Sequence, residues 1–382
     1  MGDAWRRARR ILCVRLDAMG DVLMTTPAIR ALRTSAPGRH VTLLTSPAGA
    51  RVAELVPEVD DVIVHEAPWM KATPGGRGPG PDRAMIGRLR AERFDAAAIF
   101  TAYSQSPLPA ALLCHLAGIP LRLAHCREQP YHLLTDHVPE PEPDRLVRHE
   151  VRRQLDLVAS VGAVTADERL SLAIPPPARR AVGRRLRALG MEGPFVVVHP
   201  GASAPSRRYP AERFAAVAAG LAGLGLPVLV TGTEEERALA EGVALAAGPG
   251  VRPWMGRSSV AELAALLRAA ALLVSNNTGP VHVAAAVGTP VAVPYALTNP
   301  QHTPWRVPSR VLFHDVPCRW CYASACPAGH HDCLRRVEPE AVLTAARELL
   351  EGGPDAPVPA VPAASAVRPR VAAMPAPVPG DR

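Results

Sequence analysis

Several features of common protein classes are missing from this sequence of 382 residues. No uninterrupted apolar run approaches the roughly 18 residues that a membrane-spanning helix requires, so no such helix is expected. Aromatic residues make up only 4% of the chain, which argues against a surface that stacks single-stranded nucleic acid. Neither GxGxxG after the first expected strand nor GxxxxGK[ST] occurs, which disfavours a Rossmann dehydrogenase and a P-loop enzyme.

Lysine is also scarce, and nearly all of the cations are arginine. The formal net charge of +8 would attract an anionic partner such as a phosphorylated lipid surface or a nucleotide. A genome rich in G and C would raise Arg, Ala and Pro together, and all three are abundant here, so the charge alone identifies no partner. Nucleic acid is not expected as a partner, because no phosphate-binding stripe with interleaved aromatic residues is present.

The basic N-terminus precedes an apolar run, as in a secretory signal peptide. However, Arg15, Asp17 and Asp21 interrupt that run, and no small-residue cleavage site follows. Hydrophobic residues make up 48% of the chain, as in a soluble globular protein. We therefore expect a cytoplasmic protein.

Strand-like and helix-like stretches alternate along the chain in two blocks. Residues 11–16, 21–36 and 40–46 predict a β-α-β unit, which builds a parallel sheet. The alternation restarts at about residue 194, so we expect an α/β fold with two Rossmann-like domains that face a central cleft. Ligands of such sheets bind outside the carboxyl ends of the strands.

Three consecutive prolines mark the expected boundary between the two domains. We predict an N-terminal domain at residues 1–174, a Pro-rich linker at 175–180 and a C-terminal domain at 181–351. Residues 352–382 are rich in Pro and Ala and lack apolar periodicity, so we expect a disordered tail there.

Small residues recur where an expected strand passes into a helix, in LDAMGDV, HPGAS, TGTEEE and NNTGPVH. Glycine lets a ligand approach the backbone, and the free N–H groups of a helix start favour phosphate. Each turn alone is weak support for a phosphate site, because many α/β loops have this composition.

Four stretches, LDAMGDVLMTTPAIRALR, HPGASAPSRRYP, SNNTGPVHVAAAVGTP and PCRWCYASACPAGHHDC, occur in an order that resembles the ADP-heptose:lipopolysaccharide heptosyltransferases, glycosyltransferase family 9. The resemblance covers roughly residues 10–350. It implies a GT-B fold that binds the acceptor on the N-terminal domain and the nucleotide-sugar on the C-terminal domain. It also implies inverting transfer that requires no cofactor, although a loosely bound magnesium ion is left open.

Asp21 is the residue that the resemblance matches to the catalytic base of the family. Inverting transfer needs a base that takes the proton of the acceptor hydroxyl, and a carboxylate at the cleft can do this. The same resemblance places Met19 and Gly20 on the acceptor side. An Asp at this position can also cap a helix, which is the competing interpretation.

The donor side is predicted from three turns of the C-terminal domain. Arg207 matches a family lysine that contacts the donor phosphate, and because Arg208 is adjacent, one of the two is expected to bind the diphosphate. Glu234 matches the acid that holds the ribose hydroxyls, with Glu235 and Glu236 as neighbouring alternatives. The remaining donor-side residues of these turns are Gly201, Ser203 and, for the adenine, Ser258.

The turn after the strand at 271–275 departs from the family pattern. Asn277, Thr278 and Gly279 stand where relatives have Asp-Thr-Gly, and Asn299 also replaces a family aspartate. The backbone N–H groups and the threonine hydroxyl should still bind phosphate, but an amide cannot take up a proton as a carboxylate can. His282, one turn into the following helix, is expected to face the same site, or else to be an ordinary helix histidine.

Four of the seven cysteines, Cys318, Cys321, Cys326 and Cys333, fall within sixteen residues together with His330. This density in a cytosolic protein suggests structural zinc or a redox pair, but the spacing differs from that of paired CxxC knuckles. Zinc, disulfides and free thiols are all left open. The other three cysteines lie in apolar stretches and are expected in the core: Cys13, Cys114 and Cys126.

The sequence thus predicts a cytoplasmic glycosyltransferase of EC class 2.4, peripheral on the inner face of the membrane. It would move a sugar, foremost a heptose, from an ADP-sugar to a hydroxyl of a cell-envelope glycan or glycolipid such as lipopolysaccharide core. One alternative is the same fold with another donor or a small natural-product acceptor. Another is a non-catalytic relative that binds nucleotide.

Overall fold

The computed structural model describes residues 3–71, 73–75, 78–256 and 259–352. Two of the sequence predictions therefore lie outside the described residues: the role of Ser258 and the disorder of the tail from residue 353 onward. Among the described residues, none of the helices has the length and apolarity needed to cross a membrane.

The N-terminal half is a parallel six-stranded sheet in the order β3-β2-β1-β4-β5-β6. Its strands are β1 (Arg10–Arg15), β2 (His40–Thr45), β3 (Asp61–Val64), β4 (Ala96–Ile99), β5 (Leu121–Cys126) and β6 (Asp136–Pro139). Its helices are α1 (Asp3–Arg7), α2 (Met19–Thr34), α3 (Pro47–Ala53), α4 (Gly80–Ala91), α5 (Leu108–Leu116) and α6 (Glu150–Ala159).

The C-terminal half repeats this plan in the order β12-β11-β10-β7-β8-β9, again with parallel pairing throughout. Its strands are β7 (Val196–His199), β8 (Val228–Thr231), β9 (Val251–Trp254), β10 (Leu272–Ser275), β11 (Val291–Pro294) and β12 (Ser309–Leu312). Its helices are α7 (Pro176–Ala188), a short 3-10 turn η1 (Pro205–Arg207), α8 (Ala211–Gly223), α9 (Arg237–Ala247), α10 (Val260–Ala269), α11 (Gly279–Val287), α12 (Asp332–Arg335) and α13 (Pro339–Glu351).

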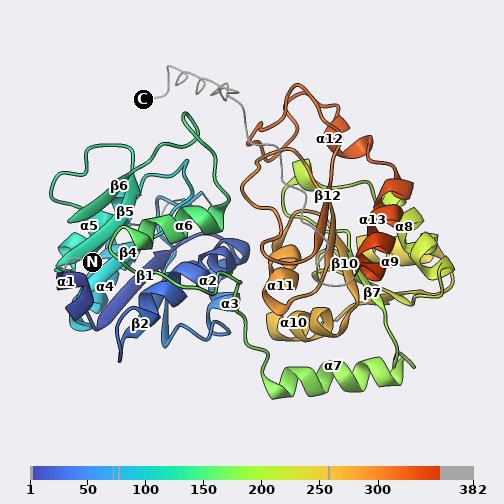
Figure 1. Cartoon of the computed structure of the whole chain (residues 1–382), viewed down its shortest axis with the longest axis horizontal. Coiled ribbons are helices and arrows are strands. Elements are labelled where there is room, and N and C mark those ends of the chain that lie inside the picture. Colours follow the sequence, from blue (N-terminus) through green and yellow to red (C-terminus); the bar gives the residue numbers. More distant parts are fainter. Residues whose placement is uncertain (1–2, 72, 76–77, 257–258, 353–382) are drawn as a thin grey trace.

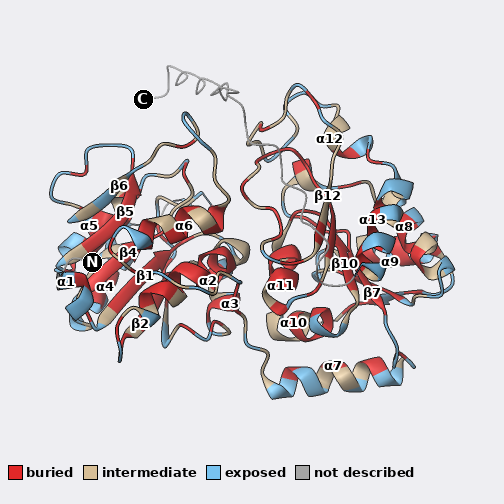
Figure 2. Cartoon of the chain, in the orientation of Figure 1, coloured by how far each residue is buried: buried red, intermediate tan, exposed pale blue. Residues whose placement is uncertain are grey.

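The predicted α/β class with two Rossmann-like halves is confirmed, and Figure 1 shows the two halves side by side. The buried apolar runs explain the sheets, since all residues of β4, β7, β8, β10 and β11 are buried, as parallel strands between two helical layers must be. Figure 2 shows the complementary pattern, with exposed residues on the outer faces of the helices.

The Pro-rich stretch at 175–180 contains the start of helix α7, which begins at Pro176. Proline suits the first turn of a helix because its fixed φ is helical and its missing N–H needs no partner there. Helix α7 packs on α10 of the C-terminal half through Ala178, Val182 and Leu186 (Figure 1). The exact domain boundaries stay a prediction.

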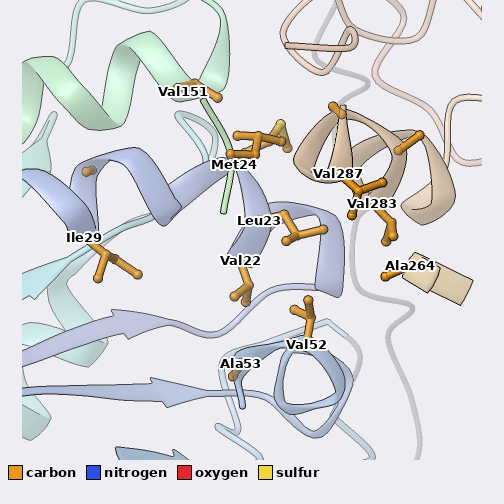
Figure 3. Packing of buried hydrophobic residues seen from close by; sticks show 14 of the residues in the cluster. Val22, Leu23, Met24, Ile29, Val52, Ala53, Val151, Ala264, Val283 and Val287 are labelled. Carbon is orange, nitrogen blue, oxygen red and sulfur yellow. The ribbon is translucent and has the colours of Figure 1, made fainter. Parts of the chain in front are cut away.

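The two halves meet where α2 packs against α11. Figure 3 shows Leu23 and Met24 of α2 facing Val283 and Val287 of α11, and one apolar cluster includes all four. Because both helices follow the carboxyl end of a central strand, β1 or β10, their N-termini lie together between the two sheets. This is the region in which an open α/β sheet binds its ligand.

Candidate active site between the two halves

Asp21 lies in the first turn of α2, and both of its carboxylate oxygens have partners. Oδ1 is 3.1 Å from Nη2 of Arg15, and Oδ2 accepts a hydrogen bond from the N–H of Ala18 at 3.2 Å. The second contact is the helix-capping role that the sequence left open. The side chain is still 19% exposed, so a ligand between the two halves can reach it.

Arg15, the last residue of β1, connects Asp21 to two other carboxylates. Its Nε is 2.9 Å from Asp17 Oδ2, and its Nη1 is 2.8 Å from Glu150 Oε1. Burial alone would raise the pKa of Glu150, but the guanidinium groups of Arg15 and Arg153 lower it to about 2. Burial raises the pKa of Asp17, and the Arg15 guanidinium only partly offsets this.

The N-terminus of α11 stands directly across from Asp21. A Cβ on Gly20 would lie 2.7 Å from Cδ2 of His282, and a Cβ on Gly279 would lie 2.5 Å from Cε of Met19. The backbones can approach this closely because neither glycine carries a side chain. Met19 and Gly20, predicted on the acceptor side, and Gly279 and His282, predicted on the donor side, are thereby brought together.

The two asparagines of the turn after β10 have different surroundings. Asn276 is fully buried; its Oδ1 accepts from the N–H of Tyr209 at 2.9 Å, and its Nδ2 donates to the carbonyl of Pro200 at 2.7 Å. Asn277 is 1% exposed, and neither of its side-chain polar atoms makes a hydrogen bond among the described residues. Thr278 precedes α11 with its hydroxyl unused as a cap. The turn therefore keeps polar atoms available for a ligand.

The structure separates Arg207 from Arg208. Nε of Arg208, an exposed residue, donates to the carbonyl of Ala202 at 2.9 Å. Arg207 is half-buried, and within the described part of the chain its guanidinium makes no hydrogen bond or ion pair. Of the two predicted diphosphate ligands, only Arg207 is thus an uncommitted cation.

Two histidines lie between the catalytic and donor sides. Burial lowers the pKa of His282, and the nearby Arg207 guanidinium lowers it further. Burial also lowers the pKa of His302 to about 4, with Glu150 opposing this shift and Arg207 and Arg15 reinforcing it. The charges of both Arg15, in the N-terminal half, and Arg207, in the C-terminal half, act on His302. The two sides of the site are therefore close together. Both histidines are neutral near pH 7.

The acidic residues after β8 point in different directions. Glu234 is more than half exposed and pairs with Arg237 at 2.7 Å. Glu236 instead packs over Gly201, where a Cβ would lie 2.2 Å from its carboxylate, and it accepts from the N–H of Thr233 at 2.9 Å. The structure thus brings Glu236, rather than the predicted Glu234, to the HPGAS turn. Ser203 of that turn is exposed.

Asn299 lies in a turn that crosses to the N-terminal half. Its Oδ1 accepts from the N–H of Gln301 at 3.3 Å, and the carbonyl of Gln301 accepts from the N–H of Glu150 at 3.0 Å. Two residues further on, the carbonyl of Thr303 lies 2.9 Å from Nε2 of His149. Asn299 therefore shapes a contact between the halves.

The four clustered cysteines form no disulfide; three of them lie in a loop that contacts η1, and Cys333 lies in α12. In this loop the carbonyls of Ala323 and Ser324 accept hydrogen bonds from Ser206. Sγ of Cys318 is 3.6 Å from Nε2 of His330. No group of three or more His, Cys, Asp or Glu side chains is placed to hold a metal ion in the part of the chain that the structure describes. The three other cysteines are buried, as predicted: Cys13, Cys114 and Cys126.

Sequence reasoning missed Arg15, Glu150 and His302 as candidate site residues, and it named Glu236 only as an alternative to Glu234. Arg15 offered a signal, since a charged residue at the end of an otherwise apolar strand needs a partner when it is buried. Glu150 and His302 offered no comparable signal, because only the fold brings them to Asp21.

Known proteins resemble this chain over most of its length. The sequence model of glycosyltransferase family 9 (heptosyltransferase) matches residues 83–331. Lipopolysaccharide heptosyltransferase 2 of Escherichia coli strain K12 is 25% identical over 355 residues, which cover 89% of this chain and 98% of that protein.

Solved structures have the same fold. The glycosyl transferase family 9 protein of Veillonella parvula superposes with a TM-score of 0.75 at 23% identity, covering 90% of this chain and 97% of the other. A heptosyltransferase of Escherichia coli, solved with ADP-2-deoxy-2-fluoro heptose, superposes with a TM-score of 0.66 at 20% identity. The match covers 89% of this chain and 99% of the other. These likenesses confirm the GT-B fold. Because the family match spans well over half of the chain, the protein is a transferase that belongs to glycosyltransferase family 9.

Proposed function

We propose that this protein is an inverting glycosyltransferase that moves heptose from ADP-heptose to a hydroxyl of a cell-envelope glycan such as lipopolysaccharide core. A relative's name supplies the acceptor class, and a structural neighbour that binds an ADP-heptose analogue supplies the donor class. The observation that carries the proposal is the arrangement of side chains where the two halves meet. A partly exposed carboxylate, Asp21, stands across from the uncommitted cation Arg207 and the unpartnered amide of Asn277.

The reaction is a single in-line displacement at the anomeric carbon. As the acceptor oxygen attacks this carbon, its proton passes to the carboxylate of Asp21, and the bond between the anomeric carbon and the diphosphate oxygen breaks. ADP leaves with the electron pair of that bond. Since the attacking and leaving oxygens lie on opposite faces of the carbon, the configuration inverts.

The leaving diphosphate develops negative charge, which the C-terminal half can stabilise. The Arg207 guanidinium can make two parallel hydrogen bonds to phosphate oxygens. The backbone N–H of Gly279 adds a donor and α11 a favourable dipole, whereas Pro280 has no N–H and the N–H of Val281 donates to the carbonyl of Thr278. No step requires a metal ion, although a loosely held magnesium ion could share the diphosphate charge.

The nucleoside portion would lie along the turns after β7 and β8. There Glu236 stands at Gly201 with its carboxylate at the carboxyl ends of both strands, and we assign it the ribose hydroxyls in place of Glu234. A carboxylate accepts hydrogen bonds from two vicinal hydroxyls, which suits this role.

The acceptor would approach from the N-terminal half, beside Met19 and Gly20. We further propose that the protein works in the cytoplasm, in peripheral contact with the anionic inner face of the membrane. Helix α7 supports this contact with three exposed arginines at helical spacing, Arg180, Arg184 and Arg187. Sedimentation with anionic vesicles should decrease as salt rises to about 0.5 M, whereas salt-independent binding would contradict an electrostatic contact.

A binding panel of ADP- and UDP-sugars tests the proposed donor. We expect calorimetry to show tight binding of ADP-heptose and weaker binding of UDP-sugars, with Glu236→Gln weakening ADP and Glu234→Gln leaving its affinity unchanged. Binding of a UDP-sugar in preference to ADP-heptose would instead show the same fold with another donor. Binding without any transfer to heptose-deficient lipopolysaccharide core would indicate another acceptor or a non-catalytic relative.

A further inference from the structure

The cluster around Arg15 contains three carboxylates and is almost closed to solvent. The Arg15 side chain is wholly buried and lies within 3.1 Å of Asp17, Asp21 and Glu150. A guanidinium offers five donors in a planar fork, so one side chain can fix the directions of all three carboxylates. The carboxylates outnumber the cation that they share.

Stability alone does not account for this excess of negative charge. Removing a carboxylate from water costs free energy that a shared cation repays only in part. Glu150 is 1% exposed, yet it competes with Asp21 for the same guanidinium. Its backbone N–H donates to the carbonyl of Gln301 at 3.0 Å, so a contact between the two halves fixes its position.

We propose that Arg15 and Glu150 are positioning residues that set the direction and the basicity of Asp21. Arg15 holds one oxygen of Asp21 and favours its ionised form. Glu150 occupies another edge of the guanidinium and offsets part of its charge, so that Asp21 can still take a proton from the acceptor hydroxyl. This inference rests on the proposed function, in which Asp21 is the base.

Few other groups near Asp21 carry charge near pH 7. Asp17, on the preceding turn, shares Arg15, and its pKa is raised by burial. Burial keeps His282 and His302 of the C-terminal half neutral. The remaining charged groups are Arg153 on α6, whose Nη1 lies 4.0 Å from Glu150, and Arg207 across the cleft.

Two substitutions should move the basicity of Asp21 in opposite directions. Arg15→Met removes the cation but keeps the carboxylates, so the acid limb of kcat/KM should move to higher pH by about one unit. Glu150→Gln removes a negative charge but keeps an acceptor for Arg15. The acid limb should then move to lower pH, and the KM for the donor should change little.

A purely structural role would not give opposite shifts. The matched control is Glu58→Gln, since Glu58 is a similarly buried carboxylate that lies 2.8 Å from Arg30, away from the cleft. It should lower the midpoint of urea unfolding without moving the acid limb. If Arg15→Met fails to fold, Arg15→Lys takes its place. Arg15→Lys should retain part of the activity, and its acid limb of kcat/KM should move less than that of Glu150→Gln.

A second readout does not depend on turnover. Carbon-13 NMR of the Asp21 carboxyl, assigned by its loss in Asp21→Asn, should titrate at higher pH in the Arg15 variant and at lower pH in Glu150→Gln. Unchanged titration and unchanged acid limbs in both variants would overturn the inference while leaving Asp21 as the base. If Asp21→Asn itself keeps full transfer, the proposed function fails first.

Discussion

At the scale of single residues, the two adjacent arginines Arg207 and Arg208 have different surroundings. Arg207 lies near His282 and His302 and has no hydrogen-bond or ion-pair partner among the described residues, whereas Arg208 is exposed and hydrogen-bonds to the carbonyl of Ala202. Arg207→Ala should weaken ADP binding by roughly 10- to 100-fold, because charged hydrogen bonds contribute about 1.5–3 kcal/mol. Isothermal titration calorimetry checks this.

Arg208→Ala is the control for this prediction, since it removes the same charge one residue away. It should change the affinity for ADP by less than about threefold at moderate salt. If Arg208→Ala loses more affinity for ADP than Arg207→Ala does, then Arg207 is the wrong choice for the arginine that binds the diphosphate.

Residues that act through their local motif could be predicted from the sequence, and residues that act through the fold could not. Asp21 and the turn at Asn277 sit in short motifs whose resemblance to a known family gives them a role. Arg15 and Glu150 are 135 positions apart, and their contact depends on how α6 packs against α2 and β5. Glu236 was only one of three adjacent acids until the turn placed it against Gly201.

At the scale of elements, the turn between β10 and α11 contains two asparagines with different surroundings, Asn276 with protein partners and Asn277 without a hydrogen bond of good geometry among the described residues. Asn276→Ala should destabilise the protein by roughly 2 kcal/mol or more, because the buried N–H of Tyr209 and carbonyl of Pro200 would lose their partner. Asn277→Ala should change stability by less than about 1 kcal/mol, since within the described part of the chain its amide makes no hydrogen bond of good geometry and interacts only with the Tyr295 hydroxyl.

For the affinity of ADP-heptose, Asn277→Ala should have the larger effect and Asn276→Ala the smaller one. Asn277→Ala should reduce the affinity about tenfold if the amide contacts the donor, whereas Asn276→Ala should affect the folded protein's affinity less. Urea unfolding and calorimetry on the same two variants make this comparison. Equal effects of both substitutions on stability would contradict the division of roles.

The elements found from the sequence are those with strong apolar runs or clear helical spacing. The strands missed were β5, β6, β9 and β12, and all four contain charged or half-exposed positions that break the pattern. Both β9 and β6 contain proline and lie at sheet edges, where a strand can do without one N–H donor. Their place in the fold comes from pairing with a buried neighbour.

At the scale of the whole molecule, the contact between the halves is rich in buried neutral histidines. Burial lowers the pKa of His149 and His302 to about 4, and His125, near the same region, is lowered to about 4. Between pH 6.5 and about pH 4, these side chains are protonated in the unfolded chain but neutral in the folded one. The free energy of unfolding should therefore fall as the pH falls from 6.5 to 4, by roughly 1 kcal/mol per unit for each histidine.

Urea unfolding at pH 7 and pH 5 measures this slope. His302→Gln should make the slope smaller, whereas His115→Gln, at an exposed position of α5, should leave it unchanged. A free energy of unfolding that is higher at pH 5 than at pH 7 would contradict the burial of neutral histidines at this contact.

The most direct test of the central claim is heptose transfer by the protein and by Asp21→Asn. The wild-type protein should transfer heptose from ADP-heptose to heptose-deficient lipopolysaccharide core. Asp21→Asn should bind ADP-heptose with similar affinity but lose at least about 100-fold in kcat, as expected for loss of a general base. Asp315→Asn, at an exposed carboxylate paired with Arg319, should keep full activity. Undiminished transfer by Asp21→Asn would contradict the account, because the carboxylate at the centre of the cleft would then not be the base.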